Sequence, residues 1–280
     1  MRESSNPVFR SLPKSQGGYA QFGGGAAAYG AQQTMSQPYT QYPPQQAGFS
    51  RSLTIDDVVT KTGITLAVLS VTAVVSYFMV SANLALAGPL AMIGSIGGLV
   101  LVLIASFGRK QDNPAIVLSY AVLEGMFLGA FSFIIANLYS VGGPSMIFQA
   151  VVGTIGVFVG MLVVYKTGAI RVTPKFTRML VAMMFGVVFA SLANLVLGMF
   201  GVGGGAGMGL RSGGTIAIVF SLICIALAAF SFLVDFDAAD QMIRAGAPEK
   251  AAWGIALGLT VTLVWLYVEI LRLLSYFNND

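Results

Sequence analysis

Long apolar runs separated by short polar segments fill most of the chain. The runs cover residues 62–82, 87–107, 114–138, 146–166, 177–200, 215–235 and 251–275. Each exceeds the ~20 residues that a helix rising 1.5 Å per residue needs to cross a ~30 Å hydrocarbon core. Polar and apolar positions do not alternate within them, which excludes a transmembrane β-barrel. The pattern therefore predicts an all-α, polytopic membrane protein with seven transmembrane helices.

The first part of the chain has a different composition. Residues 1–52 are rich in Gly, Gln, Tyr and Pro and contain no aliphatic run, so we expect a disordered tail. An apolar segment typical of a signal peptide is also missing there, so the tail is expected to stay attached. Residues 53–280 form the predicted transmembrane domain.

Charge and residue usage narrow the function. The chain is 56% hydrophobic and 9% charged with a net charge of +4, but its basic residues fall in short loops and form no continuous face for nucleic acid. It contains no histidine, which excludes Ser-His catalysis and His-ligated zinc or haem. We therefore expect no nucleic-acid partner, no resident cofactor and no enzyme activity.

The distribution of basic residues predicts the orientation. Near the membrane, ten lie just before the first helix or in alternate loops: Arg51, Lys61, Arg109, Lys110, Lys166, Arg171, Lys175, Arg178, Arg244 and Lys250. The other ends of the helices carry only Arg211 and Arg272. By the positive-inside rule, the N-terminus is expected in the cytoplasm and the C-terminus outside, in a multi-pass protein of the plasma (inner) membrane.

Glycine pairs suggest how the helices pack. Gly94/Gly98, Gly125/Gly129, Gly156/Gly160 and Gly254/Gly258 are spaced four residues apart within apolar runs. Such pairs let the backbones of neighbouring helices approach closely. We expect them at helix–helix contacts.

Five carboxylates lie in or beside the apolar runs. Glu124 and Glu269 are well inside the third and last runs, where an ionised group costs at least ~2.5–3.5 kcal/mol and often marks an ion or proton pathway. Asp235 ends the sixth run, and Asp237 and Asp240 follow it. If the helix ended there, their charges would oppose its macrodipole. These five residues are the candidate functional centre.

Several segments resemble the Bax inhibitor-1 family of membrane proteins. They include Leu-Val-Asp-Phe-Asp-Ala-Ala-Asp-Gln from residue 233 and Leu-Tyr-Val-Glu-Ile-Leu-Arg from residue 266. The Asn113-Pro114 entry to the third run and the loop of residues 165–174 are more similar to the bacterial branch. The similarity covers residues 55–277. It implies a last helix that is central to the bundle, and a pH-sensitive calcium leak governed by two aspartates on the last two helices.

The resemblance leaves the second acidic position open. Phe236-Asp237 best matches the family's first aspartate, and Leu266-Tyr267-Val268-Glu269 matches the second. Alignment from the preceding Ala-Leu-x-Leu instead places Thr262 there, with Glu269 two turns further along the same helix face.

Two nearby carboxylates in a low-dielectric site share a proton, and losing it produces repulsion that separates helices and attracts a divalent cation. The resulting hypothesis is a calcium leak that opens at raised cytoplasmic pH. Asp237 and Glu269 are the main gating residues and transient calcium ligands, Asp235 and Asp240 assist, and Glu124 and Thr262 line the pathway.

The alternative is a regulator that binds other membrane proteins, such as a protease. An intramembrane aspartyl protease is disfavoured because the sequence signatures of that class are missing.

Overall fold

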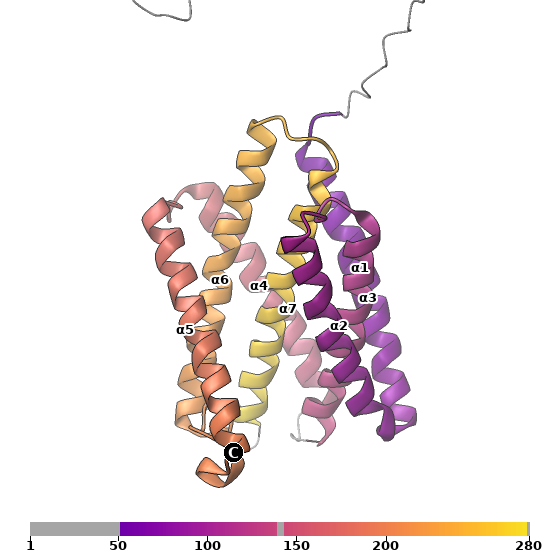
Figure 1. Cartoon of the computed structure of the whole chain (residues 1–280), viewed down its shortest axis with the longest axis vertical. Coiled ribbons are helices and arrows are strands. Elements are labelled where there is room, and N and C mark those ends of the chain that lie inside the picture. The colour runs from indigo at the N-terminus through magenta and orange to yellow at the C-terminus, as the bar shows by residue number, and fades with distance from the viewer. Residues whose placement is uncertain (1–50, 139–142, 279–280) are drawn as a thin grey trace, which may run out of the picture. The chain divides into compact units, whose positions relative to one another are not determined.

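The computed structural model describes residues 51–138 and 143–278, and in this part of the chain seven helices are long and apolar enough to cross a membrane (Figure 1). They are α1 (Ile55–Ala82), α2 (Ala87–Phe107), α3 (Pro114–Phe133), α4 (Gly143–Thr167), α5 (Pro174–Met199), α6 (Thr215–Arg244) and α7 (Ala251–Phe277). Short helical turns η2 (Leu84–Leu86), η3 (Ile134–Leu138) and η4 (Val202–Gly205) lie in or beside three of the connections. The predicted fold class is confirmed. Almost all of the expected tail, residues 1–50, lies outside the described residues.

Local sequence signals explain where several helices begin. The Thr54 hydroxyl accepts from the Asp57 backbone N–H, and the Asp57 carboxylate accepts from the Thr54 backbone N–H, which together form a capping box. Asn113 caps α3 and Thr173 caps α5, each directly before a proline at the first helical position. These caps satisfy backbone donors that would otherwise lack partners at the membrane boundary.

The sixth helix is longer than its apolar run. The run ends at residue 235, whereas α6 continues as a regular helix to Arg244. Hydropathy marks where a helix leaves the hydrocarbon region, and polar residues can extend the helix beyond that point. The three aspartates therefore lie within the helix, and the macrodipole penalty expected for a helix end does not apply to Asp235.

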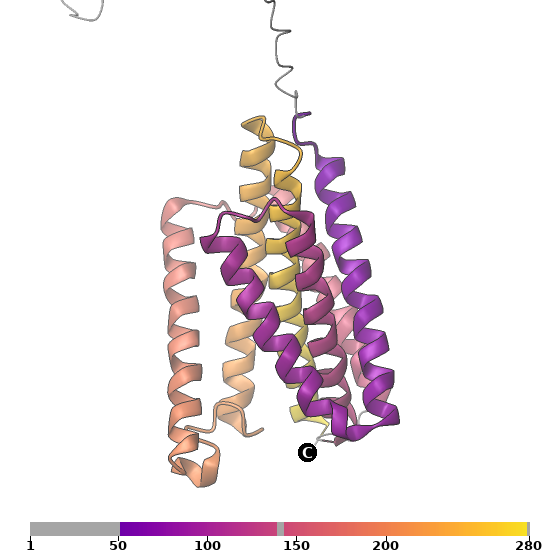
Figure 2. The ribbon, with the colours of Figure 1, turned by 45° about the vertical axis from the view of Figure 1, so that its right-hand side comes forward.

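The last helix is central. α7 packs against α1, α3, α4 and α6 and lies among them (Figure 2). Its buried side chains include Leu266 and Leu271. In contrast, α5 stands at the edge of the bundle in both views, packs mainly on α6 and buries only Leu180. Since every other spanning helix except α2 and α5 packs on it, α7 links the pieces of the bundle.

Two of the four glycine pairs lie at close helix contacts. A Cβ on Gly94 would lie 2.5 Å from the Phe127 backbone, and one on Gly129 would lie 2.1 Å from the Ala73 carbonyl oxygen. These pairs therefore allow α3 to pack tightly against α2 and α1. A Cβ on Gly156, Gly160 or Gly258 would meet nothing within 4 Å, so the other two pairs do not serve this purpose as pairs.

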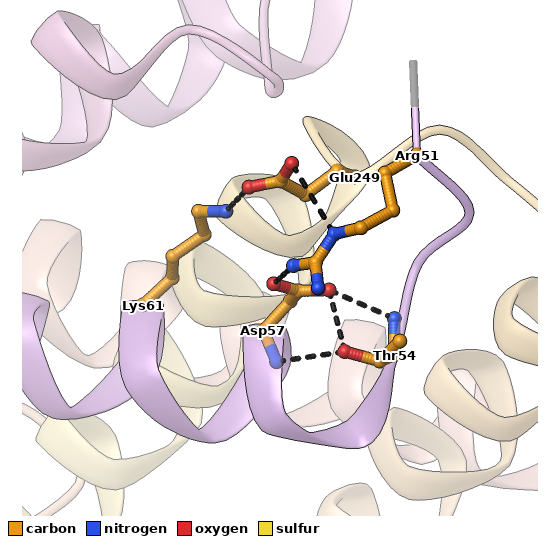
Figure 3. A network of polar contacts seen from close by, with 5 residues as sticks. All are labelled: Arg51, Thr54, Asp57, Lys61 and Glu249. Atoms are coloured by element: carbon orange, nitrogen blue, oxygen red, sulfur yellow. Dashed lines mark hydrogen bonds and ion pairs between the residues drawn. The ribbon is translucent and has the colours of Figure 1, made fainter. Parts of the chain in front are cut away.

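The segment before α1 is fastened to the connection between α6 and α7 (Figure 3). The Leu53 N–H donates to the Ala247 carbonyl at 2.8 Å, and the Glu249 N–H donates to the Arg51 carbonyl at 2.9 Å. Glu249 also pairs with Lys61 of α1 at 2.6 Å, and Arg51 pairs with Asp57. This clasp, formed by residues 51–61 and 247–249, holds the starts of α1 and α7 together.

Candidate functional site

The α2–α3, α4–α5 and α6–α7 connections lie at one end of the bundle, together with the clasp; we call it the basic end because it carries the ten basic residues counted above. Near it, α6 and α7 meet through a side-chain contact. The Thr262 hydroxyl of α7 donates to the Asp235 carboxylate of α6 at 2.7 Å. Among the described residues, no lysine or arginine forms an ion pair with Asp235. The structure thus joins two of the predicted residues and leaves the carboxylate without a balancing cation.

Asp235 also lines a small cavity of about 140 Å³. Gln111 and Asp112 of the α2–α3 connection form another part of its wall, and Gly254 and Gly258 of α7 a third. A Cβ on Gly254 would lie 3.3 Å from the Cβ of Gln111, so a larger residue there would push the connection outward. Glycine at this position lets the α2–α3 connection lie close to α7, which brings a second carboxylate to the cavity of Asp235.

Asp237 and Asp240 lie on the same helix but have partners of their own. Asp237 accepts a hydrogen bond from Gln241 at 2.6 Å, one turn further along α6. Asp240 pairs with Arg244 at 2.8 Å and accepts from the Tyr165 hydroxyl at 3.4 Å. Neither residue lines the Asp235 cavity. Both therefore belong to the partly exposed surface of α6.

Glu269 lies in a separate polar cluster toward the other end of the bundle. Its side chain is buried, pairs with Arg272 at 2.7 Å and accepts from the Ser221 hydroxyl of α6 at 3.3 Å. Ser221 and Asp237 are 16 residues apart on α6, about 24 Å along the helix axis. The expected pairing of Asp237 with Glu269, as gate or as calcium ligands, is therefore not built by this structure.

The Glu269 cluster also includes charge from the α5–α6 connection. Partial burial and the positive charge of Arg272 lower the pKa of Arg211 from its ordinary value, while the charge of Glu269 acts in the opposite direction. Arg211 thus lies near enough to interact with both charges, while Arg272 alone forms an ion pair with Glu269 among the described residues. The positive charge of the arginines therefore offsets the negative charge of the buried Glu269 side chain.

Glu124 takes a third position, between α2 and α3. A Cβ on Gly98 would lie 2.3 Å from a Glu124 carboxylate oxygen, so the carboxylate packs directly over that glycine. Within residues 51–138 and 143–278, no hydrogen bond or ion pair is found for the Glu124 carboxylate. It contacts neither Asp235 nor Glu269 and stands apart from both polar clusters.

The described residues contain no group of three or more acidic, histidine or cysteine side chains suited to a metal ion. The Asp235 cavity offers two carboxylates, from Asp235 and Asp112, and the amide of Gln111. Since calcium takes six to eight oxygen ligands, most of them would have to be water.

Sequence reasoning missed Asp112 and the pairing of Glu269 with Arg272. The second had a local signal, since the two are three residues apart on one helix face. Counting residues from the α6–α7 connection would have predicted contact between Asp235 and Thr262. Asp235 lies 9 residues before the end of α6 at Arg244, and Thr262 lies 11 residues after the start of α7 at Ala251. Antiparallel helices joined by a short turn bring such equal depths together. For Asp112, in a loop, no comparable count exists.

Comparison with known proteins supports the resemblance seen in the sequence. Residues 6–279 match the sequence model of the family described as Bax inhibitor 1 like, so the match also extends into the tail. A search of curated proteins found no match. With seven membrane-spanning helices and a family match over nearly its whole length, the chain belongs to the Bax inhibitor 1 like family of membrane proteins.

Proposed function

We propose that this protein is a pH-sensitive cation leak channel of the plasma membrane, with calcium as the conducted ion, and that protonation of Asp235 gates it at the basic end. The observation that carries the proposal is the Asp235 carboxylate of α6, which accepts from Thr262, lines a small cavity with Asp112, and has no cation partner among the described residues. The basic end and the N-terminus face the cytoplasm, and the C-terminus faces outside. No cofactor and no enzymatic step are part of the proposal.

The gating step follows from the groups that line the cavity. The ionisable side chains there are Asp235 of α6 and Asp112 of the α2–α3 connection, with Gln111 beside them. When Asp235 is protonated, it is neutral and the connection lies close to α7. When it loses the proton, the negative charges of Asp235 and Asp112 repel each other, and both attract water and cations into the cavity of about 140 Å³. Raised cytoplasmic pH therefore opens the pathway, and acid closes it.

Thr262 determines which segment the repulsion displaces. Its hydroxyl donates to the Asp235 carboxylate at 2.7 Å and can do so in either protonation state. The contact between α6 and α7 therefore persists, and these helices are also joined by the short connection of residues 245–250. The repulsion displaces the α2–α3 connection instead. This replaces the two-helix latch that pairing Asp237 with Glu269 would have required.

A second function, a regulator that binds other membrane proteins, is favoured by α5. This helix packs mainly on α6 and exposes large apolar side chains, among them Phe185 (71% exposed) and Phe189 (75%). A partner helix in the membrane could cover that face. A regulator of this kind would tolerate neutral replacement of Asp235, whereas the channel would lose its pH response.

The test is calcium flux into proteoliposomes that hold the purified chain, with pH on the basic-end side stepped from about 6 to about 8. The wild type should leak more at the higher pH. Asp235→Asn keeps an oxygen to accept from Thr262 but cannot ionise, and should give the same low flux at both values. Asp240→Asn, on the same helix but paired with Arg244, is the matched control and should keep the wild-type response.

No leak at any pH would overturn the channel and favour the regulator. A leak whose pH response survives Asp235→Asn would retain a channel but remove Asp235 as its gate.

A further inference from the structure

A larger cavity lies on another face of α7. Its volume is about 510 Å³, within the ~300–1,000 Å³ range of ligand pockets in proteins. α1 and α4 form its rims, and residues of α3 and α7, including Leu128 and Val264, form its floor. α1 packs on α3 and α7, and α4 packs on α6 and α7. The cavity therefore lies between α1 and α4, with α7 at its base.

The mouth of this cavity faces the hydrocarbon of the membrane. Val74 and Phe78 on α1 and Ile155 on α4 line it and are 55%, 64% and 56% exposed. Along α1 the lining extends from Leu66 to Phe78, which is 12 residues or about 18 Å. Half of a ~30 Å hydrocarbon core is about 15 Å. On α4, which ends at the basic end, the lining extends from Pro144 to Ile155, in the half away from that end. The cavity therefore has roughly the length of one leaflet and extends into the leaflet away from the basic end.

The buried hydroxyls of the lining offer little to water. The Ser132 hydroxyl is hydrogen-bonded to the Tyr267 hydroxyl at 2.7 Å, and the Thr154 hydroxyl donates to the Ala150 carbonyl of its own helix at 2.7 Å. These buried hydroxyls already have partners. Because a buried water needs two to four polar partners, a hollow lined in this way favours hydrocarbon over water.

We propose that the cavity binds one acyl chain of a membrane lipid, taken from the leaflet opposite the basic end. The apolar lining, the length of one leaflet and the paired hydroxyls select a hydrocarbon chain rather than a polar ligand. The bound chain packs on Val264 and Tyr267 of the central helix and fills the space between α1 and α4. It is a structural ligand of α7, independent of the proposed ion pathway at Asp235.

The test is photo-crosslinking in phosphatidylcholine vesicles in which a fraction of the lipid carries a diazirine on one acyl chain. Ser132 (5% exposed) and Tyr267 (8%) lie on the floor, where lipids at the outer surface do not reach. Adducts on these two residues are expected, together with adducts on lipid-facing positions.

Paired valines provide the matched variants. Val151 lines the cavity and Val152 does not, although both face the lipid at 40% and 51% exposure. Val151→Trp should remove most of the floor adducts, and Val152→Trp should leave them. Val74→Trp and Val75→Trp repeat the comparison on α1, with the same expected contrast. Adducts confined to outward-facing residues, or floor adducts that survive both cavity-filling variants, would overturn the proposal.

Discussion

The contacts between α6 and α7 include two carboxylate–hydroxyl pairs, and the helix that carries the acid differs between them. Toward the basic end, an acid of α6, Asp235, accepts from a threonine of α7; toward the other end, an acid of α7, Glu269, accepts from a serine of α6. They differ in their cation. Glu269 pairs with Arg272, and Asp235 forms no ion pair within the described residues.

That difference assigns the two acids different roles. A buried carboxylate beside an arginine keeps its charge, because the pair compensates the loss of hydration. A carboxylate without a cation can change its charge at lower cost and can thereby act as a sensor. Sequence position alone, within an apolar helix, does not separate the two cases.

The largest effect is expected from breaking the Glu269 pair. Arg272→Ala leaves a buried carboxylate without its cation and should lower the free energy of unfolding by about 3–5 kcal/mol. Arg244→Ala removes the cation of an exposed pair, with Asp240, and should cost no more than about 1 kcal/mol. Equilibrium unfolding in detergent measures both. Equal losses would mean that Glu269 is not held as a compensated charge.

An intermediate effect is expected at Thr262. Thr262→Val removes a hydroxyl that stabilises the charged form of Asp235 by about 1.5–3 kcal/mol, so the leak should open at a pH about one to two units higher. Thr260→Val is the control, because that buried hydroxyl donates only to the Ala256 carbonyl of its own helix. Flux as a function of pH gives both midpoints. A midpoint that moves equally in the two variants would contradict the specific role of Thr262.

The smallest effect is expected at the clasp. Glu249→Gln removes the charge of a partly exposed side chain that pairs with Lys61 at 2.6 Å and with Arg51 at 3.8 Å. It should lower the free energy of unfolding by less than about 1 kcal/mol, and the loss should shrink as salt is added. Asp56→Asn changes an exposed acid in the first turn of α1 and should have no measurable effect. A loss above about 2 kcal/mol would show that the clasp supports more than the start of α7.

The fold was accessible from the sequence because membrane-spanning length and apolar composition fix the helices one at a time. The predicted run of residues 87–107 coincides with α2, and the last run ends two residues before α7 does. The end of α6 was missed by nine residues, since Phe236 to Arg244 continue the helix after the apolar run stops.

The site was less accessible because it depends on depth and on a loop. Choosing between Thr262 and Glu269 required knowing which residue of α7 lies level with the aspartates of α6, and motif similarity gave two registers. The contribution of Asp112 comes from the close approach of the α2–α3 connection to Gly254, a contact between segments about 140 residues apart that no helical pattern encodes.

The central claim is that one end of the bundle moves with pH and the other does not. The direct measurement is the distance between spin labels by electron paramagnetic resonance, in a Cys224→Ser background. One pair, at Lys110 and Ala245, spans the basic end; the other, at Leu84 and Ile216, spans the opposite end. Raising pH from about 6 to about 8 should lengthen the first distance, leave the second unchanged, and have no effect on either in Asp235→Asn. An unchanged first distance, or an increase that persists in Asp235→Asn, would contradict the account.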